Sequence, residues 1–204
     1  ISAIIGYSSF IMGFVVAVLA FYYAHRFNRF QWSFVFLGIS YFAYGTAEYL
    51  WYRLDIIEIE AYGSLADLAY VWYFIFGILH VFVMLTYFQK CGLRTITVVV
   101  LGSVGLAMFY VIPSLGSEWF EYGMFFSAIA SVLAATAIMT TYRLLRTNLR
   151  KSWVLFGVAI SVASLTDIWY YTQENLTGYE YGQFPLMDGL WAATDFLIVI
   201  AILV

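Results

Sequence analysis

The chain has 204 residues, of which 64% are hydrophobic and only 10% are charged, and its formal net charge is −3. About a quarter of the residues of a soluble domain are charged, so this composition excludes an ordinary soluble protein. It also offers no basic patch for nucleic acid. We therefore expect an integral membrane protein whose main partner is the lipid bilayer.

Seven segments are apolar over about 20 residues, the length that a helix needs to cross the hydrocarbon core. Short polar connections such as HRFNR and RTNLRKS separate them, which predicts one compact bundle. The fold class is therefore all-α, with a single domain over 1–204. In chain order, the predicted helices cover residues 3–24, 32–52, 65–88, 95–113, 121–143, 152–172 and 185–204.

The basic residues predict the orientation. Eight of the nine lie in the first, third and fifth connections, and Arg53 is the exception. Under the positive-inside rule these connections are cytoplasmic, so the N-terminus lies outside and the C-terminus inside a multi-pass protein of the cell membrane. The eight residues are Arg26, Arg29, Lys90, Arg94, Arg143, Arg146, Arg150 and Lys151.

The first three and the last three predicted helices resemble each other. Trp32 and Trp153 each open a helix after a basic turn, and these helices end in AEYLWY and TDIWYY. The sequence therefore predicts repeat A over about 3–88, a linker helix at 95–113 and repeat B over about 121–204. Both repeats would have the same orientation, as in a parallel repeat about the membrane normal.

Carboxylates recur at the same points of both repeats. Glu48 and Asp167 lie toward the outer ends of their helices, whereas Asp67 and Asp188 begin the helices that follow. Asp195 lies seven residues after Asp188, about 10 Å deeper on the same face. No lysine or arginine lies within these spans to pair with the acids, so protons, water or a cation must compensate them.

Two interpretations remain open for Asp67 and Asp188. One is capping, because Ser64 and Asp67 form an S-x-x-D pattern and Pro185 precedes Asp188 at a helix start. The other is an outer polar pocket that also includes Glu48, Asp167 and Asp195. Capping does not apply to the acids near helix C-terminal ends, which the helix dipole opposes. Tryptophans would form the pocket walls, namely Trp51, Trp72, Trp169 and Trp191.

Such a pocket suits a cation, a proton or a small amphiphile. A divalent metal ion is one candidate, held by oxygen ligands from Glu48, Asp67, Asp167 and Asp188. Retinal is excluded, because the only lysines, Lys90 and Lys151, lie in connections. A bis-histidine haem is disfavoured, because His25 lies in a turn while His80 lies within a span, where we expect it to bond to a neighbouring helix.

The sequences GSLADLAY and FPLMDGLW, each following an acid and aromatic residues, resemble the membrane input modules of archaeal and bacterial sensor histidine kinases and diguanylate cyclases. The resemblance implies a sensor without enzymatic activity of its own, joined to a cytoplasmic output domain beyond Val204 in a longer, dimeric protein that is itself a histidine kinase. The end of the chain within the apolar run FLIVIAILV agrees with this. The alternative is a small cation- or proton-coupled transporter, because such repeats and intramembrane carboxylates also suit carriers.

Overall fold

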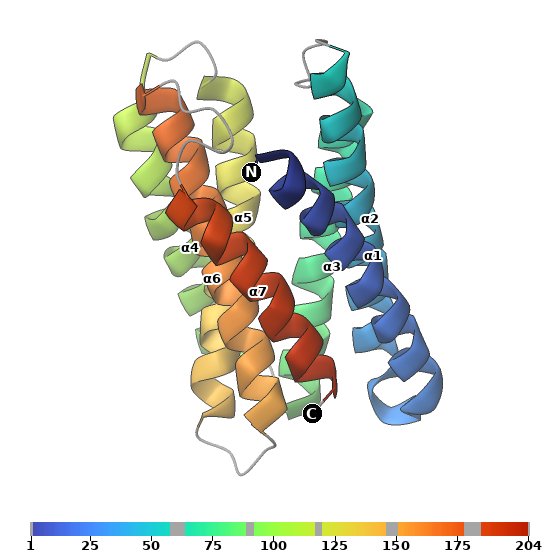
Figure 1. Ribbon diagram of the computed structural model, residues 1–204. Helices are drawn as coiled ribbons and strands as arrows, with labels where there is room; N and C mark the ends of the chain where they lie inside the picture. Colours follow the sequence, from blue (N-terminus) through green and yellow to red (C-terminus); the bar gives the residue numbers. More distant parts are fainter. Residues whose placement is uncertain are drawn as a thin grey trace.

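A computed structural model describes residues 2–57, 64–88, 92–116, 120–145, 151–177 and 185–203, which form seven α-helices, one 3-10 helix and no strand (Figure 1). The all-α prediction is confirmed for this part of the chain, and each helix lies close to its predicted range. The helices are α1 (Ser2–Arg26), α2 (Gln31–Ile56), α3 (Leu65–Phe88), α4 (Leu93–Ser114), α5 (Phe120–Leu144), α6 (Lys151–Thr177) and α7 (Pro185–Leu203), and the 3-10 helix is η1 (Asn28–Phe30).

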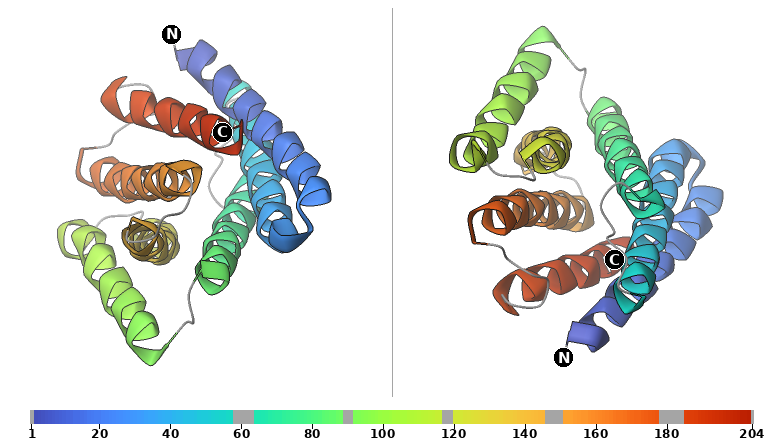
Figure 2. Two further views of the ribbon diagram at one scale, coloured as in Figure 1. Left: turned by 90° about the horizontal axis from the view of Figure 1, so that it is seen from below. Right: turned by 90° about the horizontal axis from the view of Figure 1, so that it is seen from above.

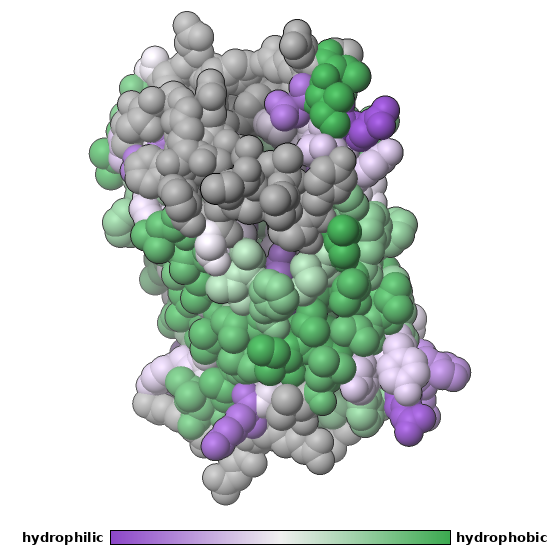
Figure 3. All heavy atoms as spheres, viewed as in Figure 1, coloured by the Kyte–Doolittle hydropathy of each residue, from purple (hydrophilic) through white to green (hydrophobic). Residues whose placement is uncertain are grey.

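Five of these helices, α1, α3, α4, α5 and α6, are long and apolar enough to cross a membrane. The apolar part of α7, Gly189–Leu203, is shorter. Helix α2 is long enough but more polar, because it carries Glu48, Arg53 and Asp55. Figure 3 shows an apolar band across the middle of one face, with hydrophilic residues toward the two ends. These features indicate a helical membrane protein.

The helices form two groups of three, with α4 outside (Figure 2). Helix α2 packs against both α1 and α3, and α6 packs against both α5 and α7. We call α1–α3 the first unit and α5–α7 the second unit. The units meet where α3 packs against α5 and α1 packs against α7, while α4 packs on α5 and α6.

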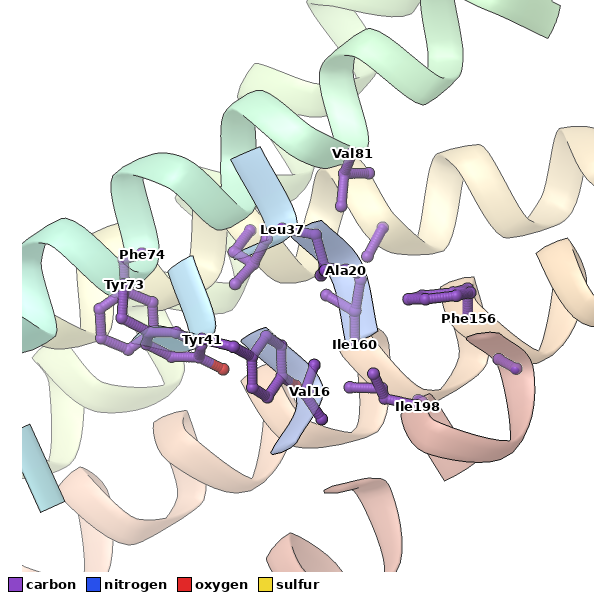
Figure 4. Packing of buried hydrophobic residues seen from close by; sticks show 14 of the residues in the cluster. Val16, Ala20, Leu37, Tyr41, Tyr73, Phe74, Val81, Phe156, Ile160 and Ile198 are labelled. Carbon is purple, nitrogen blue, oxygen red and sulfur yellow. The ribbon is translucent and has the colours of Figure 1, made fainter. Parts of the chain in front are cut away.

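The core runs through both units. Figure 4 shows Tyr41, Tyr73 and Phe74 together at one end of the buried cluster, and Phe156 and Ile198 at the other. Aromatic contacts join the units within this core. The rings of Phe74 on α3 and Phe126 on α5 lie 6.5 Å apart, and Phe126 stacks on Tyr171 of α6 at 5.7 Å.

Helices α1 and α2 touch through their backbones at a pair of glycines. A Cβ atom added to Gly13 would lie 2.9 Å from the Cα of Gly45, closer than a real Cβ atom comes to a neighbouring heavy atom. Small residues allow this proximity between helices in a bilayer, where dispersion contacts drive association. The glycine pair therefore fixes how α2, which carries Glu48, lies against α1.

Candidate functional site

Three acids from both units meet inside the bundle. Glu48 comes from α2 of the first unit, and Asp167 and Asp195 come from α6 and α7 of the second. Asp195 lies within electrostatic range of both other carboxyls, and Asp167 lies within range of Glu48. The structure thus brings together three of the five acids that the sequence predicts to share a pocket.

Two of these acids accept hydrogen bonds from aromatic side chains. The Tyr70 hydroxyl on α3 donates to Oε1 of Glu48 at 2.5 Å. The indole Nε1 of Trp191 on α7 donates to Oδ1 of Asp167 at 2.9 Å. In each unit, the third helix therefore holds the acid near the end of the second helix. A buried carboxylate needs such donors, because it has left the water that would otherwise solvate it.

The third acid, Asp195, lies deeper and is only 5% exposed. Asp195 interacts electrostatically with the two other acids and with two tyrosines, Tyr41 and Tyr73. The carboxyl therefore faces the interface between the units, where α2 and α3 supply the tyrosines.

Four tyrosines of the first unit form one group beside the acids, which we call the tyrosine cluster: Tyr41, Tyr44, Tyr70 and Tyr73. The rings of Tyr41 and Tyr73 lie 6.0 Å apart, and those of Tyr44 and Tyr73 lie 5.1 Å apart. Tyr44 also approaches Tyr41 and Tyr70, at 5.8 and 6.5 Å. The cluster was not predicted from the sequence, although Tyr41 and Tyr44 precede Glu48 by seven and four residues, the spacing of one helix face.

The two acids at helix starts differ from the other three. Asp67 is half-buried in the first turn of α3, and Oγ of Ser64 accepts a hydrogen bond from the Ala66 N–H at 3.0 Å. This bond confirms a side-chain cap by Ser64 at the start of α3. Asp188 belongs to the first turn of α7, but its side chain lies outside the described part, so its place in the pocket stays a prediction.

The four tryptophans that the sequence predicts to line the pocket differ in their burial and in their contacts. Trp191 bonds to Asp167 and lies 5.4 Å from the Tyr170 ring. Trp51 and Trp169 are half-buried. Trp72 is 46% exposed, and its ring stacks on Phe76 at 5.6 Å.

The predicted metal site cannot be assembled from the described side chains. Among them, no three histidine, cysteine, aspartate or glutamate side chains are placed to share a metal ion. A site at Glu48, Asp67, Asp167 and Asp188 stays a prediction, because it includes the Asp188 side chain.

His80 has the environment expected from the sequence. It is fully buried on α3, and its Nδ1 lies 2.8 Å from the Ser33 carbonyl oxygen on α2. Because a carbonyl oxygen only accepts, Nδ1 carries the hydrogen. The ring also lies 5.7 Å from Phe156 on α6, whereas His25 is exposed at the end of α1. His80 thus links α2 and α3 next to the second unit.

What the site can do follows from its charge. Three carboxyls in electrostatic range repel one another when ionised, and no lysine or arginine of the described residues is among the charges that act on them. A proton or a bound cation would remove this repulsion across the interface of the two units. Comparison of the chain with models of protein families, with curated proteins and with solved structures finds no match.

Proposed function

We propose that the chain is the membrane-embedded input module of a signalling protein, in which a cation or proton held among Glu48, Asp167 and Asp195 controls how the two units lie against each other. One observation carries the proposal: the acids come from both units and lie in electrostatic range of one another. Adding positive charge there draws the units together, and removing it drives them apart.

The proposal includes a parallel repeat, seven crossing helices, an outside N-terminus and a cytoplasmic C-terminus. The bond from Tyr70 to Glu48 and the bond from Trp191 to Asp167 support the repeat, because they join corresponding positions of the two similar segments. The interface pattern supports it too. If the two units are related by a two-fold repeat, α1 corresponds to α5 and α3 corresponds to α7. The contact between α1 and α7 then corresponds to the contact between α5 and α3, and both contacts are present.

In the proposed mechanism, α7 carries the signal. It contributes Asp195 and Trp191 to the site and packs against both α1 and α6. A change of charge at the site alters which arrangement of the units is favoured. A shift of α7 then reaches an output domain following Val204, the arrangement that the resemblance to sensor kinase input modules implies.

A cation- or proton-coupled transporter is the second candidate, and the paired interfaces α1–α7 and α3–α5 favour it. Two similar units that meet around intramembrane carboxylates are also the plan of several carriers. Both candidates require the acids. They differ in whether the ion crosses the membrane.

Flux through the reconstituted protein separates the two. The chain is placed in liposomes, and uptake of protons, sodium and potassium is followed with internal dyes. The sensor predicts uptake equal to that of a Glu48→Gln/Asp167→Asn/Asp195→Asn variant and of empty liposomes. Saturable uptake that the triple variant abolishes would refute the sensor in favour of the transporter. In parallel, the reading frame after Val204 is sequenced. A kinase or cyclase domain there supports the sensor, and a stop codon soon after Val204 contradicts it.

A further inference from the structure

Three buried polar side chains at the interface of the units have no hydrogen-bond partner among the residues that the structure describes. The exposed fractions of Tyr41, Tyr73 and Asp195 are 3%, 8% and 5%. Within the described ranges, no hydrogen bond is made by the two hydroxyls or by the carboxyl. Buried tyrosine hydroxyls and carboxyls normally have such partners, so these three groups retain unused capacity to bind a guest.

The three groups lie around one place. Tyr41 and Tyr73 each lie in electrostatic range of Asp195 and Asp167, and their rings are 6.0 Å apart. The only wholly enclosed side-chain polar atoms without a partner in the described residues are Nε2 of His80 and Oγ of Ser127. The oxygens of the three groups therefore keep some accessible surface, which a guest can contact.

The chemistry of these groups defines the guest. A carboxylate only accepts hydrogen bonds, so the guest must donate to Asp195, and a guest near three acids gains from positive charge. Tyrosine supplies a ring face that attracts cations and a hydroxyl oxygen that accepts a hydrogen bond. A bare metal ion fits less well, because no three acidic, histidine or cysteine side chains of the described segments can share one.

We propose that Tyr41, Tyr73 and Asp195 bind an organic cation through its ammonium group. The ammonium donates hydrogen bonds to the Asp195 carboxylate and to the tyrosine oxygens, and the rings of the tyrosine cluster contact its positive charge. Phe74 and Val16 belong to the same buried cluster as the two tyrosines and lie near them in Figure 4, so a short alkyl substituent meets apolar surroundings. The inference rests on the proposed function, because it names the cation that the site between the units detects.

Thermal unfolding of the whole chain in nanodiscs tests the site. Methylammonium, ethylammonium and tetramethylammonium chlorides are titrated against sodium, potassium and magnesium chlorides at matched ionic strength. We expect the two primary amines to raise the unfolding temperature saturably, and tetramethylammonium, which has no N–H, to do so more weakly. Asp195→Asn should raise the half-saturating concentration by about tenfold or more, since it removes a charge-assisted bond.

Tyr73→Phe provides a second variant, because it removes only a hydroxyl that bonds to no described residue and so leaves the fold intact. It should raise the half-saturating concentration by about three- to tenfold. Asp55→Asn and Tyr22→Phe, both at exposed positions, are the matched controls and should titrate like the unmodified chain.

The outcomes separate this inference from the proposed function. Equal stabilisation by amines and inorganic cations, or amine titrations unaffected by both Asp195→Asn and Tyr73→Phe, overturns the ammonium site but leaves a charge-sensing interface. The site is supported if the amines stabilise Asp195→Asn and Tyr73→Phe more weakly than the unmodified chain but stabilise the two control variants normally. If neither amines, inorganic cations nor acidification changes the stability of the unmodified chain, both proposals fail.

Discussion

The indole of Trp191 donates a hydrogen bond to Asp167 at 2.9 Å, and this bond fastens the second turn of α7 to α6 within the second unit. Trp191→Phe keeps an aromatic ring and removes the donor. We expect the free energy of unfolding to fall by about 1–3 kcal/mol, because the half-buried carboxyl loses its partner. Chemical unfolding in detergent measures this. Trp32→Phe, at a 61% exposed position, is the control and should have little effect. Equal losses in both variants would show that the bond contributes nothing.

Asp195→Asn should stabilise the chain in buffer that lacks organic cations. The substitution removes one of three mutually repelling charges and a buried carboxylate that has no hydrogen-bond donor in the described ranges. We expect a gain of about 1 kcal/mol, measured as the midpoint of thermal unfolding. The order should reverse at a methylammonium concentration that saturates the unmodified chain, because the amine binds the variant more weakly and stabilises it less. A destabilised variant in cation-free buffer would mean that Asp195 already has a stabilising partner.

The sequence predicted the helices well, because the bilayer imposes their length and polar connections mark their ends. It also singled out Glu48, Asp167 and Asp195, which lie in electrostatic range of one another, since an acid within an apolar run is conspicuous; their role as a binding site stays a prediction. It did not identify Tyr41 and Tyr73. The chain has 18 tyrosines, and which of them face Asp195 depends on how α2 and α3 are rotated toward α7. That rotation is set by contacts between helices, such as Gly13 with Gly45.

Gly13→Val should destabilise the packing of α1 on α2. The added side chain would collide with the backbone of Gly45, which cannot move aside as a flexible side chain can. We expect a loss of about 1–3 kcal/mol, the usual range for overpacking. Gly105→Ala on α4 is the control, because nothing lies within 4 Å of the added Cβ atom, and it should leave stability unchanged or slightly higher. Unfolding midpoints that match for the two variants would rule out the close contact.

His80→Leu should weaken the link between α2 and α3. The variant removes the bond from Nδ1 to the Ser33 carbonyl and the nearby Ser33 hydroxyl contact at 2.9 Å. We expect the free energy of unfolding to fall by about 1–3 kcal/mol. Hydrogen exchange should show faster opening near Ser33. His25→Leu, at an exposed position, serves as the control. Unchanged exchange near Ser33 in His80→Leu would contradict the link.

The most direct test of the charge-sensing interface is the distance between the two units. Spin labels are placed at Ile57 on the first unit and Leu186 on the second, both exposed, after Cys91→Ser removes the only cysteine. Double electron–electron resonance then compares the distance between the labels in this chain with the distance in a chain that also carries Glu48→Gln, Asp167→Asn and Asp195→Asn. We predict a distance shorter by about 1–2 Å or more in the neutral variant at neutral pH, and a matching shortening of the unmodified chain when acid protonates the carboxyls. Identical distances in both chains under both conditions would contradict the claim that charge at this site positions the units.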